Sequence, residues 1–426
     1  MTKYPTYKDS GIEWLGQIPT HWEMLKAKYM FQKNKREVQD GDKVITCFRD
    51  GQVTLRENRR TTGFTESITE IGYQGIRKGD LVIHQMDAFA GAIGVSDADG
   101  KGTSVYHCCT PKGEYLTYYY AHVIREMALK GYIQSLYRGI RERSSDFNYV
   151  TFGNCLLPVP SPSEQRQIVA YLDYKSNKIN ERICQREREL QTLSELKQAE
   201  IAAVVTRGLD PNVPMKESGI EWLGKIPAHW EVRKIKNCLQ ERSEKGYPNE
   251  PILCATQSRG VIPQDMYDNR VVVVNKDFDK LKLVKCGDFV ISLRSFQGGI
   301  EYAYYQGIIS AAYTILTPKD KRNSEYFKHL FKSHDFIQLL QTCVTGIREG
   351  QNINYAMLAK HFIPIPPIEE QQKIVLYIKN RLYVIDEYIA KLKTEINYLQ
   401  EYKQRLISDV VTGKVDVRGV EIPNEE

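Results

Sequence analysis

The chain has 426 residues, of which 42% are hydrophobic and 26% charged, with a formal net charge of +6 and a pI near 8.6. This composition predicts a packed protein of two or three domains and excludes a wholly disordered chain. No apolar run has the length of a membrane span and no signal peptide is evident, so we expect a cytoplasmic location. The mildly basic charge permits nucleic-acid binding without requiring it.

The chain contains an internal repeat with a period near 207 residues. The first copy opens with SGIEWLGQIPTHWE at 10–23, and the second opens with SGIEWLGKIPAHWE at 218–231. Residues 40–78 and 245–286 share almost nothing. This period is too long for a solenoid repeat, which spans about 20–50 residues. It predicts two copies of a whole domain and its connector, carrying two different surfaces. Shorter matches keep nearly the same offset: Gly79–Ile83 with Gly287–Ile291, Gly139–Glu142 with Gly346–Glu349, Pro158–Pro160 with Pro364–Pro366, and Glu164-Gln165 with Glu370-Gln371.

Each copy begins with a mixed region that predicts a compact α+β domain of roughly 150 residues. Short β-type runs bounded by Gly and Asp predict strands, and one or two helices follow them. The expected strands are Lys43–Phe48, Gln52–Leu55, Leu81–His84 and Thr103–Cys109 in the first copy, and Val271–Val274, Phe289–Leu293 and Ala311–Leu316 in the second. The expected helical regions are Leu116–Tyr137 and Ser324–Thr342.

A long helix is predicted after each proline cluster, at 158–162 and 364–367, because proline is compatible with a first helical turn. The second helix carries an a/d heptad stripe that is broken at Lys403. Arg186, Lys197 and Glu200 interrupt the weaker stripe of the first. We expect the two stripes to bury each other as an antiparallel pair. The stripe residues of the second helix include Ile378, Ile385, Leu392, Leu399 and Leu406.

The predicted fold class is therefore α+β. Two α+β domains are separated by two long antiparallel helices that form a coiled coil, in a pseudo-twofold internal repeat. The expected boundaries are 1–157 for the first domain, 158–210 for the first long helix, 211–363 for the second domain, and 364–426 for the second long helix with a C-terminal tail.

Motifs of catalysis and metal binding are missing from the sequence. It has no P-loop, His-Glu-x-x-His, nucleophile elbow or kinase signature, and Pro366-Pro367 lies between isoleucines, unlike a methyltransferase tetrapeptide. These absences argue against a stand-alone enzyme. Nine cysteines without a Cys-x-x-Cys pair predict reduced thiols. His107-Cys108-Cys109 is the nearest zinc candidate, but it aligns with Thr314, Ile315 and Leu316, which favours core packing. We expect His21 and His229 to pack as well.

Several motifs occur twice in one order. They are WLGxIPxHWE, a Gly-x-x-polar loop, a proline cluster, and Glu-Gln-x-x-Ile at the start of a long helix. In this order the chain resembles the DNA-specificity subunit of a Type I restriction-modification system over nearly its whole length. One departure is the Arg-Glu pair at 141–142 and 348–349, in loops that are often more neutral in this family. The motifs are Trp14–Glu23 and Trp222–Glu231, Gly139–Asn148 and Gly346–Ile353, Pro158–Pro160 and Pro364–Pro367, and Glu164–Ile168 and Glu370–Ile374.

The resemblance implies a non-catalytic chain with two target-recognition domains that read an asymmetric, bipartite site on double-stranded DNA. Its implied partners are two modification subunits, which are methyltransferases, and two restriction subunits, which translocate and cut DNA. The chain itself would bind no cofactor; S-adenosylmethionine, ATP and Mg are implied for the partners. The alternative is a coiled-coil adaptor between proteins without sequence-specific DNA binding. Binding to random duplex, with and without modification subunits, would separate the two hypotheses.

Base edges are read mainly by Arg, Lys, Asn and Gln. The candidate DNA-binding residues are therefore polar side chains of the divergent loops and of the two Gly-Ile-Arg segments, Gly139–Asn148 and Gly346–Ile353. In the first domain they are Arg56, Arg59, Arg60, Gln85, Arg141 and Arg143. In the second domain they are Gln257, Ser258, Arg259, Arg294, Gln297, Arg348, Gln351 and Asn352.

Overall fold

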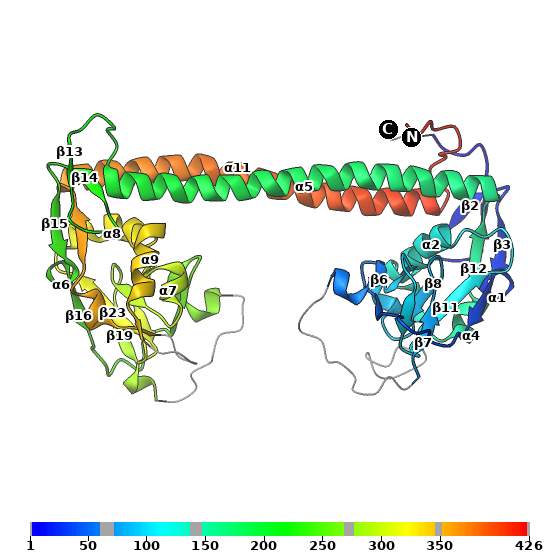
Figure 1. The fold of residues 1–426 in the computed structure, drawn as a ribbon, viewed down its shortest axis with the longest axis horizontal. Helices are drawn as coiled ribbons and strands as arrows, with labels where there is room; N and C mark the ends of the chain where they lie inside the picture. The colour runs from blue at the N-terminus through cyan, green and yellow to red at the C-terminus, as the bar shows by residue number, and fades with distance from the viewer. Residues whose placement is uncertain (1, 60–71, 137–146, 268–276, 346–351, 424–426) are drawn as a thin grey trace. The chain divides into compact units, whose positions relative to one another are not determined.

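The computed structural model describes residues 2–59, 72–136, 147–267, 277–345 and 352–423 (Figure 1). The chain divides into two compact units, and the two longest helices contribute to both. Unit 1 comprises residues 1–185 and 395–426, and unit 2 comprises residues 186–394. The longest helices are α5 (Pro162–Arg207) and α11 (Ile368–Val411). The domain boundaries predicted from the sequence stay a prediction.

A four-stranded antiparallel sheet lies at the centre of unit 1, in the order β4-β11-β8-β9. Side chains alternate between its two faces, as strand geometry requires. Leu81 and Ile83 pack on one face with helix α2 (Thr117–Leu129), whereas Val82 packs on the other face in a smaller core. The strands are β4 (Phe31–Asn34), β11 (Tyr106–Pro111), β8 (Leu81–His84) and β9 (Ile93–Val95).

Four two-stranded ribbons complete the strands described in unit 1. They are β1 (Tyr7–Asp9) with β2 (Gln17–Pro19), β3 (Glu23–Lys26) with β12 (Leu156–Val159), β5 (Ile45–Cys47) with β6 (Val53–Leu55), and β7 (Gln74–Ile76) with β10 (Gly100–Gly102). The short helices are α1 (Ala27–Met30), η1 (Arg56–Asn58), η2 (Ala88–Ala90), α3 (Tyr132–Ser135) and α4 (Tyr149–Asn154).

Unit 2 repeats this topology. Its central sheet has the order β16-β23-β20-β21, with Phe289 and Leu316 in the larger core and Val290 and Ile315 in the smaller one. The divergent stretches 40–78 and 245–286 therefore contribute strands to equivalent ribbons, because different apolar residues satisfy the same strand alternation. The sheet strands are β16 (Leu239–Arg242), β23 (Thr314–Pro318), β20 (Phe289–Ile291) and β21 (Glu301–Tyr302).

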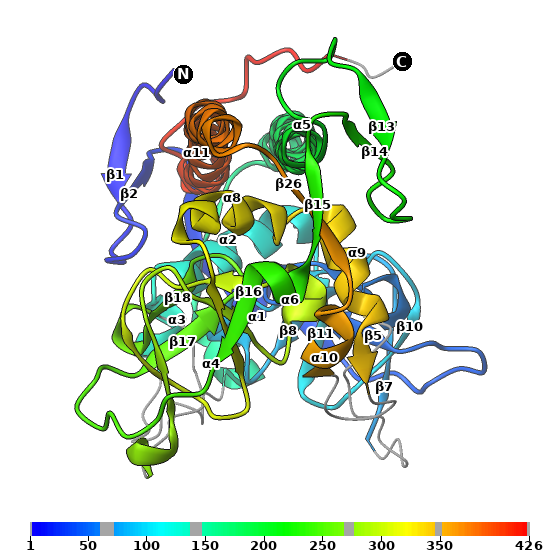
Figure 2. The same cartoon turned by 90° about the vertical axis from the view of Figure 1, so that its left-hand side faces the viewer.

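The ribbons of unit 2 are β13 (Met215–Glu217) with β14 (Lys225–Pro227), β15 (Glu231–Lys234) with β26 (Phe362–Ile365), β17 (Leu253–Thr256) with β18 (Gly260–Pro263), β19 (Lys282–Val284) with β22 (Gly307–Ile309), and β24 (Val344–Thr345) with β25 (Asn352–Ile353). Its shorter helices, several of which Figure 2 labels, are α6 (Ile235–Cys238), η3 (Gln264–Met266), η4 (Phe278–Lys280), α7 (Ser295–Gly298), η5 (Lys321–Asn323), α8 (Ser324–Leu330), α9 (His334–Thr342) and α10 (Tyr355–Leu358).

Within each unit, α5 and α11 lie side by side and run antiparallel (Figure 1). In unit 2, Glu200 of α5 contacts Arg381 of α11 at 2.9 Å, and Lys197 contacts Asp386 at 2.5 Å. The residue number falls along α5 while that of the contacting residue rises along α11, which shows that the two helices are antiparallel. These contacts explain why Lys197 and Glu200 interrupt the apolar stripe. In unit 1, Leu172 and Ile179 pack with Leu406 and Val410. The predicted α+β class with two long antiparallel helices is confirmed.

The predicted elements differ from the observed ones mainly at their ends. The strand predicted at Leu81–His84 is confirmed over its full length, whereas β11 begins at Tyr106, three residues later than predicted. The helical region predicted at 116–137 contains two helices, because Gly131 adopts a left-handed φ of 75° between α2 and α3. The strand predicted at Val271–Val274 lies outside the described residues. Among the described helices, none is long and apolar enough to cross a membrane.

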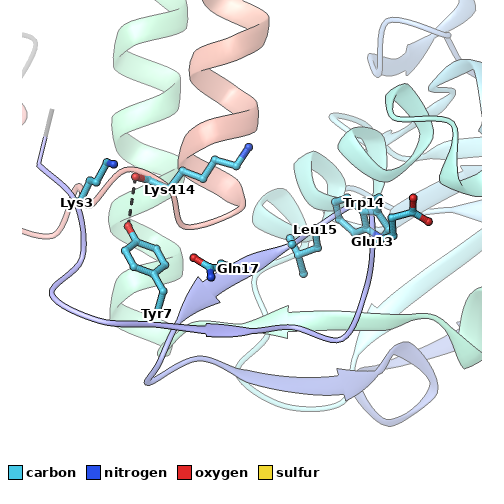
Figure 3. A pocket seen from close by; sticks show the side chains of 8 residues that line it. Lys3, Tyr7, Glu13, Trp14, Leu15, Gln17 and Lys414 are labelled. Atoms are coloured by element: carbon cyan, nitrogen blue, oxygen red, sulfur yellow. Dashed lines mark hydrogen bonds between the residues drawn. The ribbon is translucent and has the colours of Figure 1, made fainter.

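The N-terminal segment and the tail after α11 lie against each other in unit 1. The backbone N–H of Asp416 donates to the carbonyl of Thr2 at 2.9 Å, and the Tyr7 hydroxyl lies 3.5 Å from the carbonyl of Lys414 (Figure 3). Tyr7, Trp14 and Lys414 border a cavity of about 520 Å³. In unit 2, the continuous chain after α5 lines the equivalent cavity of about 730 Å³. Two separate segments of unit 1 thus take the place of one continuous segment of unit 2.

Candidate nucleic-acid interface

The repeated Gly-Asp pair is a structural clamp. In unit 1, the buried carboxylate of Asp80 accepts hydrogen bonds from the Arg36 guanidinium at 3.0 Å and from the backbone N–H of Arg77 at 2.9 Å. In unit 2, Asp288 accepts equivalent bonds from Arg242 and from the backbone of Lys285. A buried carboxylate with several charge-assisted bonds fixes its neighbours. The clamp ties the central sheet to the divergent part of each unit.

The repeated His-Trp-Glu and Glu-Gln motifs meet where each long helix starts. The Glu164 carboxylate is 3% exposed and accepts hydrogen bonds from the Tyr4 hydroxyl at 2.6 Å and from Trp22 Nε1 at 3.1 Å. His21 Nε2 lies 3.0 Å from the same carboxylate. In unit 2, Glu370 receives the corresponding contacts from Trp230 and His229, at 3.0 and 2.7 Å. Each histidine thus pairs with the carboxylate at the start of a long helix, while its side chain stays 45% exposed.

The far end of each long helix is held by a buried tyrosine that sequence reasoning missed. The Tyr119 hydroxyl donates to the carbonyl of Val411 at 3.0 Å, and the Tyr326 hydroxyl donates to that of Val205 at 2.6 Å. The last carbonyls of a helix have no partner within the helix, so each tyrosine satisfies one of them. The two tyrosines lie 207 residues apart, which is the repeat period. That shared offset was the available signal.

The predicted DNA-binding residues of unit 1 lie on two segments. Arg56 is in η1, directly after β6, and Arg59 follows it. The Arg59 guanidinium lies 2.7 Å from the Asp50 carboxylate and 4.3 Å from the centre of the Phe48 ring, so the β5–β6 ribbon already engages it. Gln85 follows β8, and its carbonyl accepts the backbone N–H of Phe147 at 3.2 Å. That bond anchors the end of the Gly-Ile-Arg segment next to Gln85. Arg60, Arg141 and Arg143 lie outside the described residues.

Predicted residues of unit 2 come together more closely. The β17–β18 turn exposes three of them, and α7 with the residue before it exposes two more. β25, which opens with Asn352 at the end of the Gly-Ile-Arg segment, lies next to α7. The β17–β18 turn, α7 and β25 therefore lie close together in this unit. The exposed residues are Gln257, Ser258 and Arg259 in the turn, and Arg294 and Gln297 at α7. Arg348 and Gln351 lie outside the described residues.

A basic side chain missed by sequence reasoning ties these loops together. In unit 2, Lys332 Nζ donates to the carbonyls of Gln257 and Gly298, at 3.3 and 2.7 Å, and thereby joins the β17–β18 turn to the end of α7. In unit 1, Arg125 occupies the equivalent position and donates to the carbonyls of Arg49 and Gly91. The two residues are 207 positions apart and both are basic. In unit 2 this cation fixes two loops that carry predicted DNA-binding residues, whereas in unit 1 it joins the β5–β6 turn to the end of η2.

The predicted zinc candidate lies in the core. Cys108 and Cys109 are buried in β11, one in each core of unit 1, as Ile315 and Leu316 are in unit 2. Burial raises the pKa of the Cys108 thiol to about 12. All nine cysteines are free thiols. Within the described residues, no group of three or more His, Cys, Asp or Glu side chains is arranged to hold a metal.

Comparisons with known proteins agree with this geometry. Residues 227–398 match the type I restriction modification DNA specificity domain. A putative type I restriction enzyme MjaX specificity subunit from Methanocaldococcus jannaschii is 23% identical, and the match covers 95% of this chain and 96% of that protein.

Two solved structures share the fold. One, from work on complex assembly and conformational transition of the type I R-M system, has a TM-score of 0.65 and 15% identity, covering 93% of this chain and 99% of the other. The HsdS subunit from Thermoanaerobacter tengcongensis has a TM-score of 0.50 and 17% identity, covering 96% and 100%. The resemblance drawn from the repeated motifs is confirmed: the chain is similar to type I restriction enzyme specificity subunits over nearly its whole length.

Proposed function

We propose that this chain is the non-catalytic, sequence-specific DNA-binding subunit of a type I restriction-modification complex. One observation carries the proposal: both units keep the same frame, while the loops held on that frame differ. The frame includes the Asp80 and Asp288 clamps and the paired cations Arg125 and Lys332. The loops differ in sequence between 40–78 and 245–286. Two similar frames with different loops suit a protein that reads two different half-sites.

Within each unit, exposed polar side chains would read base edges while neighbouring cations hold phosphates. In unit 2 these readers are the β17–β18 turn, α7 and the Gly-Ile-Arg segment. In unit 1 the candidates are η1, the turn after β8 and the equivalent Gly-Ile-Arg segment. The proposed target is therefore asymmetric and bipartite, with one half-site for each unit.

The long helices would dock the partners, two modification subunits and two restriction subunits. α11 exposes large apolar and aromatic side chains that an isolated helix pair has no reason to keep. Tyr383 is 65% exposed, Tyr398 is 66% exposed and Leu376 is 59% exposed. Aromatic side chains are enriched at protein interfaces. We propose that S-adenosylmethionine, ATP and Mg are held by these partners and not by this chain, and that the complex works in the cytoplasm.

The other hypothesis is an adaptor that joins proteins without reading DNA. The exposed α11 side chains fit both hypotheses, whereas the different polar loops on a shared frame favour a reader of two half-sites. Sequencing methylated bases in a host that carries this chain and its modification subunit separates them. We expect one asymmetric motif of two short half-sites with a non-specific spacer. Methylation without such a motif would contradict the proposal.

A further inference from the structure

Each unit has a cavity where its sheet domain meets α5 and α11, and the two cavities occupy equivalent places. The cavity of unit 2 has a volume of about 590 Å³, and that of unit 1 about 420 Å³. In unit 2 the cavity is bordered by the β17–β18 turn and by α8, and in unit 1 by the β5–β6 turn and by α2. A lysine of a long helix also borders each cavity. The equivalent pairs in units 2 and 1 are Lys197 with Lys403, His329 with His122, and Lys332 with Arg125.

These lysines are among the residues that break the apolar stripes of the long helices. Lys403 Nζ donates to Asn180 at 2.8 Å, and Lys197 Nζ lies 2.5 Å from Asp386. Both also line their cavities. Each long helix thus places a lysine at the equivalent point beneath the sheet domain, where it lines the cavity as well as contacting the neighbouring helix.

The two cavities differ in charge. Among the described residues, the cavity of unit 2 is lined by Lys197, Arg259, Lys328 and Lys332, with Glu301 as its carboxylate. The cavity of unit 1 has Arg125 and Lys403 against three carboxylates, those of Asp50, Glu126 and Asp173. The cavity of unit 2 therefore favours an anion, whereas that of unit 1 does not.

Substitutions between the repeats produce this difference. The equivalent helix-end tyrosines, Tyr119 and Tyr326, align the two helices and place Ala121 where unit 2 has Lys328. The matching ribbon turns place Gly51 where unit 2 has Arg259. Lys328 is held in place, because its Nζ lies 5.3 and 5.0 Å from the ring centres of Tyr302 and Tyr304. Stacking of an ammonium on two aromatic rings restricts its position while leaving its charge available.

The acidic neighbours of the unit 2 cavity oppose an anion only weakly. Glu301 is 1% exposed and its carboxylate is 2.6 Å from Lys332 Nζ, which offsets its charge. Burial also raises the pKa of Glu301 to about 7. Glu325 and Asp386, the partners of Lys328 and Lys197, have side chains 52% and 54% exposed, so water screens both ion pairs.

We propose that the cavity of unit 2, and not its counterpart in unit 1, binds a phosphate of the DNA backbone. This inference rests on the proposed function, because it assigns the backbone contact of the same interface. The β17–β18 turn that carries the predicted readers Gln257 and Ser258 also borders the cavity. A strand read by that turn carries its phosphates past Arg259 and Lys328. Lysine ammonium groups are compact donors suited to phosphate oxygens.

The test uses matched substitutions in the full chain and its affinity for random-sequence duplex as the salt concentration changes. Lys197→Met and Lys328→Ala should each weaken binding and reduce the slope of log affinity against log salt by about 0.9 for one lost phosphate contact. The ratio of wild-type affinity to variant affinity should then fall about 3.5-fold when the salt concentration rises from about 50 to 200 mM. Lys328→Arg should keep the slope. The control Lys403→Met should leave it unchanged.

In complex with the modification subunits, the same substitutions should leave the methylated motif unchanged, because a phosphate contact carries no base information. A wild-type complex without sequence preference would refute the proposed function itself. A selective wild-type complex whose Lys197→Met and Lys328→Ala variants fold yet keep the wild-type slope would overturn the cavity assignment alone.

Two further outcomes also decide the matter. An equal loss of slope in Lys403→Met would overturn the restriction to unit 2. Inorganic phosphate serves as the second probe. If it raises the melting temperature of the wild-type chain but not of Lys328→Ala, while the salt slopes stay equal, the cavity holds a free anion and the DNA assignment is wrong.

Discussion

Removing the carboxylate of Glu164 should loosen unit 1 far more than the equivalent change loosens unit 2. In Glu164→Ala, the Tyr4 hydroxyl and Trp22 Nε1 lose their common acceptor, although both side chains are nearly fully buried. A hydrogen bond to a charged group contributes about 1.5–3 kcal/mol to stability. Because the His21 side chain is 45% exposed, its contact with Glu164 adds little. We expect a loss of about 3–5 kcal/mol in the free energy of unfolding of unit 1.

Glu370→Ala is the matched change in unit 2. The Glu370 carboxylate accepts a hydrogen bond from one buried donor, Trp230 Nε1. Because the Glu370 side chain is 24% exposed, water can partly replace this hydrogen bond in the variant. We expect a loss of about 1–2 kcal/mol. Scanning calorimetry of the full chain measures both variants. Glu164→Ala should lower the melting temperature of unit 1 by about 6–20 °C, and Glu370→Ala should lower that of unit 2 by about 2–8 °C.

The bound DNA sequence should not change in either variant, because each carboxylate anchors the start of a long helix through Trp and His side chains of the repeated motif. Equal shifts for the two variants, or a larger shift for Glu370→Ala, would refute the burial argument.

Other changes probe separate parts of the molecule. Burial raises the pKa of Glu301 from 4.5 to about 7, so its ionisation costs stability as the pH rises through this window. In urea unfolding, the free energy of unfolding of Glu301→Gln should rise relative to that of the wild type by up to about 3 kcal/mol between about pH 4.5 and 8. A difference between the two proteins that does not change with pH would contradict this. Tyr326→Phe should cost about 1 kcal/mol in the same assay, because the carbonyl of Val205 loses its donor; an unchanged midpoint would show that water replaces it. Arg348→Ala should weaken one half-site by about 1–3 kcal/mol in a binding titration if it contacts a base, whereas uniform weakening with a smaller salt slope would indicate phosphate. Tyr383→Asp should abolish co-purification of the modification subunits, and full retention would place their docking surface elsewhere.

The sequence predicted the frame well because the frame depends on local patterns. Leu81–His84 alternates between two cores, and the heptad stripe of α11 has a long enough run to identify a packed helix. The repeat added a second copy of each pattern. Cys108 could be assigned to the core because Ile315 occupies its place in the other copy.

Contacts between distant residues could not be predicted in this way. Lys332 joins the β17–β18 turn to α7, and neither partner is near it in sequence. The ribbons of the divergent stretches share a topology without sharing residues, so comparison of the copies could not reveal them. The candidate readers came from residue type and loop position alone. Residue type cannot show that Arg59 is engaged by Asp50 while Arg294 is exposed at the start of α7.

Exchanging one set of loops tests the central claim most directly. Residues 24–157 would be replaced by the same region of a related chain, and methylated bases would be sequenced in a host that carries the hybrid and the modification subunits. Because unit 2 and the long helices are unchanged, we predict a motif with one new half-site and with the other half-site and the spacer kept. A hybrid that folds and methylates but changes both half-sites, or neither, would contradict independent reading by the two units.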